Sequence, residues 1–95
     1  MYEEYQIKFS EEKNAWLQEK RRLSFSGFAD LIACGKWIRV IKDHNPQKYP
    51  GQHMFLFEQN DEIYCIPYIE DIEKKELFLK TIYPNRKLRR QYFMH

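Results

Sequence analysis

The sequence predicts an α+β fold with two N-terminal helices, an antiparallel four-stranded sheet and one C-terminal helix. Apolar residues recur at helical spacing in the first third of the chain, and short runs rich in β-branched and aromatic residues follow. A basic segment behind a helix-capping residue closes the chain. With 95 residues, 43% hydrophobic and 17% aromatic, the composition predicts a single domain over residues 1–95.

The two N-terminal helices are indicated by the residues at their ends. Ser10 is followed by two glutamates, which is typical of an N-cap with acids in the first turn, so we expect a helix over Ser10–Arg21. The second helix, Ser24–Cys34, carries apolar residues at i, i+3, i+4 and i+7 and stops before Gly35, a C-cap residue. Aromatic residues at such spacings usually pack inward. We therefore expect four of them in the core: Trp16, Phe25, Phe28 and Trp37.

The middle of the chain predicts strands. The expected segments are Trp37–Ile41, Met54–Gln59, Glu62–Tyr68 and Leu77–Tyr83. A proline-containing loop over 43–52 ends the first, and the Asn60-Asp61 pair favours a hairpin between the second and third. Pro67 weakens the end of that hairpin because proline donates no ladder hydrogen bond. The charged stretch 70–75 then precedes the fourth strand.

The last segment predicts a basic helix. Asn85 can cap it, and Leu88 and Tyr92 would share one face. The opposite face would carry Arg86, Arg89, Arg90 and Phe93. From Lys80 to the end there are five basic residues and no acid, whereas residues 57–76 hold seven acids and two lysines. The chain is therefore polarised, although its net charge is only +2.

Several functional classes are disfavoured by the composition. Cys34 and Cys65 lack metal-type or disulfide-framework spacing, which favours a reducing compartment. The three histidines, His44, His53 and His95, show no zinc spacing, so we expect no metal and no cofactor. The N-terminus lacks a basic region followed by an apolar one, and no apolar run reaches membrane length. We expect a cytoplasmic protein.

Two stretches resemble a known family. The opening, from Phe9 through the Lys13-Asn14 pair to Leu17 and on from Arg21 to Phe25, is similar to the start of BrnT-like toxins of the RelE-like superfamily. The closing stretch, Phe78–Tyr92, resembles their last strand and basic helix. Two pairs of residues depart from the family pattern: Arg21-Arg22 stands where many relatives carry His-Gly, and Leu88-Arg89 stands where they carry Ala-Thr.

The resemblance implies a RelE-like fold with a short strand before the first helix. It also implies the toxin of a type II toxin–antitoxin system, an endoribonuclease that inhibits translation. Its partners would be RNA, including ribosome-associated mRNA, and a cognate DNA-binding antitoxin encoded beside it.

The chemistry of metal-free RNA cleavage narrows the candidate residues. The ribose 2′-OH must lose a proton, the 5′-oxygen must gain one, and a cation must stabilise the phosphorane. Arg86 suits phosphate clamping, with Lys80 and Tyr83 as proton-transfer or positioning groups and Glu76 as a reserve base. The expected RNA-binding residues are Lys20, Arg21, Lys87, Arg89, Arg90 and Tyr92.

Other interpretations remain open. Lys80 could be an outward-facing strand lysine and Tyr83 a tyrosine at the rim of the core, and the arginines of the last helix could form a solvated face. The chain would then be a non-catalytic RNA- or protein-binding module with the same fold. A third possibility is an inactive relative that acts only within a repressor complex.

Overall fold

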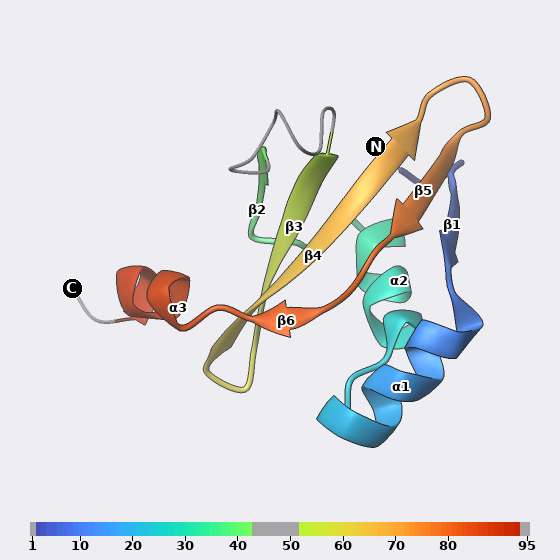
Figure 1. Cartoon of the computed structure of the whole chain (residues 1–95). Coiled ribbons are helices and arrows are strands. Elements are labelled where there is room, and N and C mark those ends of the chain that lie inside the picture. Colours follow the sequence, from blue (N-terminus) through green and yellow to red (C-terminus); the bar gives the residue numbers. More distant parts are fainter. Residues whose placement is uncertain (1, 43–51, 94–95) are drawn as a thin grey trace.

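The computed structural model describes residues 2–42 and 52–93, which form an α+β fold (Figure 1). In chain order the elements are β1 (Gln6–Phe9), α1 (Glu11–Arg21), α2 (Phe25–Ala33), β2 (Arg39–Lys42), β3 (Gln52–Gln59), β4 (Glu62–Asp71), β5 (Glu76–Leu79), β6 (Tyr83–Pro84) and α3 (Arg86–Phe93). The predicted helices are confirmed, whereas the predicted sheet needs correction.

The sheet is mixed and six-stranded, so the expectation of four antiparallel strands was wrong. The strand order is β1-β5-β4-β3-β2, and β6 continues beyond β5 along β4. β1 pairs in parallel with β5, and the other pairings are antiparallel. β1 carries little strand signal in its residues because only two of its four positions are apolar, and an edge strand is stabilised by pairing distant in sequence. The short strand implied by the family resemblance lies at this place.

Three of the expected strands also begin or end at other residues than expected. The first is shorter, because Trp37 and Ile38 precede β2. β3 begins at Gln52, within the segment expected to be a loop, and the rest of that loop, 43–51, lies outside the described residues. β4 runs through Asp71 because Glu70 and Asp71 pair with β5, so the charged turn is only 72–75.

The expected fourth strand, Leu77–Tyr83, is divided into β5 and β6. On β4, two residues lie between Cys65 and Tyr68. Their partners are Tyr83 on β6 and Leu79 on β5, and three residues lie between these two. One extra residue therefore interrupts the ladder, as in a β-bulge. Pro67 lies opposite this interruption, and its carbonyl still accepts a hydrogen bond from the Lys80 N–H at 2.8 Å.

The helix ends form as their sequences predict. Ser10 caps α1 by accepting the Lys13 N–H at 3.1 Å, and Ser24 caps α2 by accepting the Ser26 N–H at 3.1 Å. Gly35 has φ +70°, a left-handed conformation that suits glycine after a helix. Asn60 and Asp61 also have positive φ, so the β3–β4 hairpin turns as predicted.

The sheet carries a separate apolar cluster on each face. α1 and α2 cover one face, where Leu17, Phe25 and Ile32 are fully buried. On the other face lies a smaller cluster, against which α3 packs with two side chains. This second cluster consists of Met54, Leu56, Ile63 and Cys65, with Ile41, Tyr83, Leu88 and Tyr92 packed against it. Figure 1 shows the chain leading from β5 through β6 to α3.

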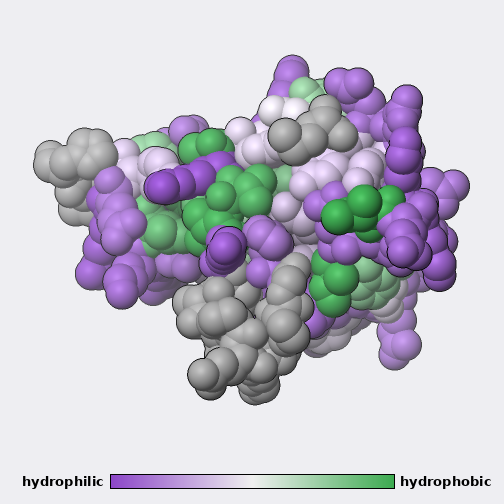
Figure 2. All heavy atoms as spheres, turned by 90° about the horizontal axis from the view of Figure 1, so that it is seen from above, coloured by the Kyte–Doolittle hydropathy of each residue, from purple (hydrophilic) through white to green (hydrophobic). Residues whose placement is uncertain are grey.

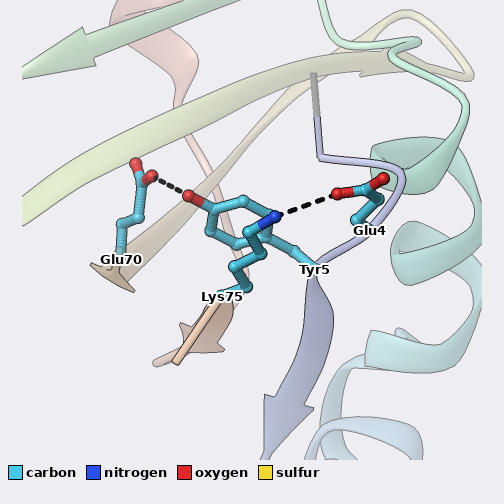
Figure 3. A network of polar contacts seen from close by, with 4 residues as sticks. All are labelled: Glu4, Tyr5, Glu70 and Lys75. Atoms are coloured by element: carbon cyan, nitrogen blue, oxygen red, sulfur yellow. Dashed lines mark hydrogen bonds and ion pairs between the residues drawn. The ribbon is translucent and has the colours of Figure 1, made fainter. Parts of the chain in front are cut away.

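Polar contacts attach the N-terminal segment to the β4–β5 hairpin (Figure 3). The Tyr5 hydroxyl donates to Glu70 at 2.7 Å, and the Lys75 ammonium forms an ion pair with Glu4 at 3.0 Å. The hydrogen bond to Glu70 raises the pKa of Tyr5 to about 12. These contacts hold the chain where it enters the edge strand β1.

Trp16 does not belong to the core, contrary to expectation. Its side chain is 40% exposed, whereas its neighbour Leu17 is fully buried. Successive helical residues point about 100° apart, so the two side chains cannot share the buried face of α1. Phe25 and Phe28 are buried as expected, and Trp37 packs against the core in a partly buried position.

Candidate functional site

The extra residue between β5 and β6 brings two predicted site residues onto one face of the sheet. In an uninterrupted strand, residues three apart point to opposite faces. The Lys80 ammonium instead hydrogen-bonds Gln52 at 2.8 Å, and the Tyr83 hydroxyl donates to the Met54 sulfur at 3.2 Å. Gln52 and Met54 lie two residues apart on β3, so they point to the same face about 7 Å from each other. Lys80 and Tyr83 therefore reach adjacent positions.

Tyr83 is positioned by the second apolar cluster. Its backbone pairs with Cys65 of β4, and its ring packs against the cluster. Burial raises the pKa of the Cys65 thiol, and hydrogen bonds with Asn85 and Tyr83 oppose that rise only in part. The thiol therefore stays neutral at physiological pH and serves as packing material rather than as a nucleophile.

Arg21 approaches the same strand from the helical side. Its guanidinium donates to the Ile82 carbonyl at 2.8 Å, which connects the end of α1 to the segment before β6. Arg21 also lines a pocket of about 490 Å³ together with Leu23, Tyr64, Tyr83 and Pro84. Of the predicted RNA-binding residues, Arg21 thus lies beside Tyr83, while Lys20 is an exposed residue one position earlier on α1.

The first turn of α3 exposes a group of cations. Asn85 caps the helix by accepting the Leu88 N–H at 3.0 Å, as its sequence position predicts. Arg86 and Lys87 are exposed in the first turn, and Arg90 is exposed one turn later. No acid lies within α3, so the positive end of the helix dipole adds to these charges. This basic surface follows Tyr83 directly along the chain.

Two predicted RNA-binding residues of α3 make contacts within the protein. Arg89 donates through Nε to the Asp61 carbonyl at 2.7 Å and lies 3.8 Å from a carboxylate oxygen of Glu62. These contacts attach α3 to the β3–β4 turn. Tyr92 is partly buried against the second apolar cluster. Both residues therefore help to hold the helix in place.

The reserve base Glu76 is distant from the other candidates along the sheet. It begins β5 and forms an ion pair with Lys8 of β1. Lys80 lies four positions after Glu76, which corresponds to about 13 Å of extended chain. Glu76 therefore contributes to the edge of the sheet rather than to the surroundings of Tyr83.

Some residues near the candidate site carried no signal in the sequence. Gln52 fell in an expected loop, and Met54 is an ordinary strand residue whose sulfur accepts the Tyr83 hydroxyl only in the folded structure. An exposed aromatic group on α1 was also missed: the Lys13 ammonium lies 4.6 Å and the Arg21 guanidinium 5.0 Å from the centre of the Trp16 ring.

The described residues offer little for metal binding. Across 2–42 and 52–93, no three His, Cys, Asp or Glu side chains form a group that could hold a metal ion. His53 lies beside the Tyr68 ring, while His44 and His95 lie outside the described residues.

Across residues 2–42 and 52–93, no helix has the length and apolar character needed to cross a bilayer. Figure 2 shows hydrophobic side chains reaching the surface in places among hydrophilic ones.

Comparisons with known proteins add no family assignment. No family model matches the chain, and neither the curated proteins nor the solved structures include a significant match. The function therefore has to be argued from the residues and their geometry.

Proposed function

We propose that this chain is a metal-independent endoribonuclease with a RelE-like fold, the toxin of a BrnT-like toxin–antitoxin pair. The observation that carries the proposal is the interrupted strand, which directs Lys80 and Tyr83 to one face. A pocket lined by Arg21 and Tyr83 adjoins the same strand, and the basic first turn of α3 follows it. β-Bulges are common beside active sites, where they redirect a side chain.

The proposed reaction needs only groups that this chain provides. The ribose 2′-oxygen attacks the adjacent phosphorus as its proton passes to a base, and the bond from phosphorus to the 5′-oxygen breaks as that oxygen receives a proton. The products are a 2′,3′-cyclic phosphate and a 5′-hydroxyl. Lys80 and Tyr83 move or position the protons, and Arg86 binds the phosphate oxygens. Arg21 supplies a second cation at the same strand, from the side covered by α1 and α2.

The hydrogen bond from the Tyr83 hydroxyl to Met54 is easily exchanged for one to a substrate. In this structure it donates to the sulfur of Met54, and a thioether is a weak hydrogen-bond acceptor. A phosphate oxygen is a stronger, charged acceptor. Substrate binding would therefore withdraw the hydroxyl from Met54 without leaving a costly unsatisfied group behind.

The proposal includes a place of action and partners. The protein would act in the cytoplasm on RNA, including mRNA on the ribosome, without a cofactor. A cognate antitoxin that binds DNA would neutralise it. An acidic antitoxin surface would be compatible with the exposed cations of α3.

The test is incubation of purified, antitoxin-free protein with total RNA in EDTA, with and without translating ribosomes. We expect fragments that end in 2′,3′-cyclic phosphate from the wild type, and at least a hundred-fold less product from Arg86→Ala and Tyr83→Phe, since one catalytic group typically contributes about 10²–10⁴-fold. Lys74→Ala, in the exposed β4–β5 turn, is the charge-matched control and should cleave normally. Intact RNA in all samples, ribosomes included, would overturn the proposal.

A second candidate is a non-catalytic RNA- or protein-binding module. It is favoured by the internal partners of the two central groups, since Lys80 is bonded to Gln52 and Tyr83 to Met54. Under this function the cations of α3 would bind without any cleavage. Charge removal would then weaken RNA binding to a similar degree for all sequences, and no fragments would appear.

A further inference from the structure

A cation-flanked tryptophan is exposed on α1, and one of its cations, Arg21, also reaches the segment before β6. The Trp16 side chain is 40% exposed, with Lys13 and Arg21 against its ring. Large aromatic side chains usually contribute to the core, where their area stabilises the fold. Leu17 and Asn14 already occupy the buried face of α1, so Trp16 adds little to packing. Its position calls for a different explanation.

The surroundings of Trp16 suit a nucleobase better than a phosphate. A pocket of about 370 Å³ opens beside the ring and is lined by Ser10, Glu12, Lys13 and Trp16. The carboxylate of Glu12 repels phosphate but can accept hydrogen bonds from the N–H groups of a base. The indole ring offers a flat π surface, and such surfaces bind the bases of single-stranded nucleic acids by stacking.

Arg21 connects this pocket with the proposed cleavage site. Its guanidinium lies over the Trp16 ring, donates to the Ile82 carbonyl and lines the pocket that contains Tyr83. A strand of RNA with one base on Trp16 would therefore have a cation beside it in the direction of Tyr83. Single-strand binding sites combine these two elements, a stacking aromatic and a cationic path for the backbone.

We propose that Trp16 is a stacking platform for one base of a single-stranded RNA, with Arg21 and Lys13 binding the adjacent phosphates. The inference rests on the proposed function, because it takes RNA as the ligand. Stacking of a base is worth more than an exposed cation–π contact, so the incoming base displaces Lys13 from the ring. The released ammonium is then placed to bind the backbone.

The test uses a short single-stranded RNA methylated at every 2′-oxygen, which cannot be cleaved. We expect Trp16→Ala to weaken its binding, measured by fluorescence anisotropy, by about five-fold to a hundred-fold, and Trp16→Phe to retain part of the affinity. Phe78→Ala removes an aromatic side chain of similar exposure, 44%, from the sheet and should bind like the wild type. A duplex of the same sequence should show no dependence on Trp16.

A second readout reports contact with the ring itself. In the Trp37→Phe variant, Trp16 is the sole tryptophan, and the methylated RNA should quench its fluorescence. Equal RNA affinity of Trp16→Ala and wild type would overturn the inference. Cleavage of unmodified RNA is scored separately. If the protein binds the methylated RNA through Trp16 but cleaves no unmodified RNA, the proposed endoribonuclease activity is refuted and the stacking role of Trp16 stands.

Discussion

The arginines of α3 should contribute unequally to RNA binding, and the salt dependence of affinity measures the difference. All three arginines are exposed, but of the three only Arg89 has internal side-chain contacts among the described residues, with the Asp61 carbonyl at 2.7 Å and with Glu62. Each cation that neutralises a phosphate of a single strand contributes about 0.7 to the slope of log affinity against log salt concentration. Alanine at Arg86 or Arg90 should therefore reduce the slope by about 0.7. Alanine at Arg89 should change it much less.

The expected differences are large enough to measure. Between 50 and 200 mM salt, a slope change of about 0.7 alters the ratio of mutant to wild-type affinity about 2.6-fold. Anisotropy titrations with the uncleavable RNA at four salt concentrations resolve this change. Arg89→Ala should instead lower the free energy of unfolding by about 0.5–1 kcal/mol, because it removes a half-exposed hydrogen bond and ion pair. This loss corresponds to a decrease in Tm of roughly 2–8 °C.

One result would refute the reasoning directly. If Arg89→Ala reduced the salt slope as much as Arg86→Ala and left the Tm unchanged, Arg89 would be an RNA contact, and its bonds to the β3–β4 turn would be unimportant. Lys74→Ala controls for the loss of a charge elsewhere on the molecule and should alter neither quantity.

Three further outcomes follow from single contacts. Asn14→Ala should lower the free energy of unfolding, measured with urea, by about 1–3 kcal/mol, because the buried Phe25 N–H loses its acceptor at 2.8 Å. Asn14→Asp keeps that acceptor, and a larger loss of stability with aspartate than with alanine would contradict this role. The folded protein should lose stability as pH rises above about 10, because the unfolded chain then releases a Tyr5 proton that the folded protein retains; the hydrogen bond to Glu70 raises the folded pKa of Tyr5 to about 12. Unfolding curves measured at alkaline pH should show a smaller decline for Tyr5→Phe. An unchanged decline would exclude Tyr5 as its source. Tyr83→Phe should fail to cleave RNA and still fold cooperatively in urea, because it keeps the ring that packs against the second apolar cluster and loses a bond to a weak sulfur acceptor. Loss of the folded state would make Tyr83 a structural residue.

The features that the sequence predicted correctly depend on residues close together in the chain. A capping serine such as Ser10 or Ser24 bonds an N–H two or three residues later, so its effect is visible in a short window. The same holds for Gly35 and for the positive φ angles of the β3–β4 turn. These local signals fixed the helices and the hairpin without any knowledge of the sheet.

The errors arose where structure depends on distant partners. β1 is a strand because its residues pair with β5, about 70 positions away, and four residues carry too weak a pattern to indicate this alone. Trp16 is exposed because α1 turns Asn14 and Leu17 toward the core, a choice set by the sheet below. Spacing within the helix could not decide between the two faces.

The candidate site combines both kinds of information. The sequence supplied the residue types, a lysine and a tyrosine three positions apart, but regular strand alternation would separate them onto opposite faces. The extra residue opposite Pro67 reverses that alternation, so the Lys80 and Tyr83 side chains both reach β3 on the α3 side of the sheet. An interruption of the ladder costs backbone pairing, and here it also lets Leu79 and Ile82, three positions apart, both enter the core under α1 and α2. The same extra residue thus serves packing on one face of the sheet and brings Lys80 and Tyr83 together on the other, and that second effect is the reason to test this strand for function.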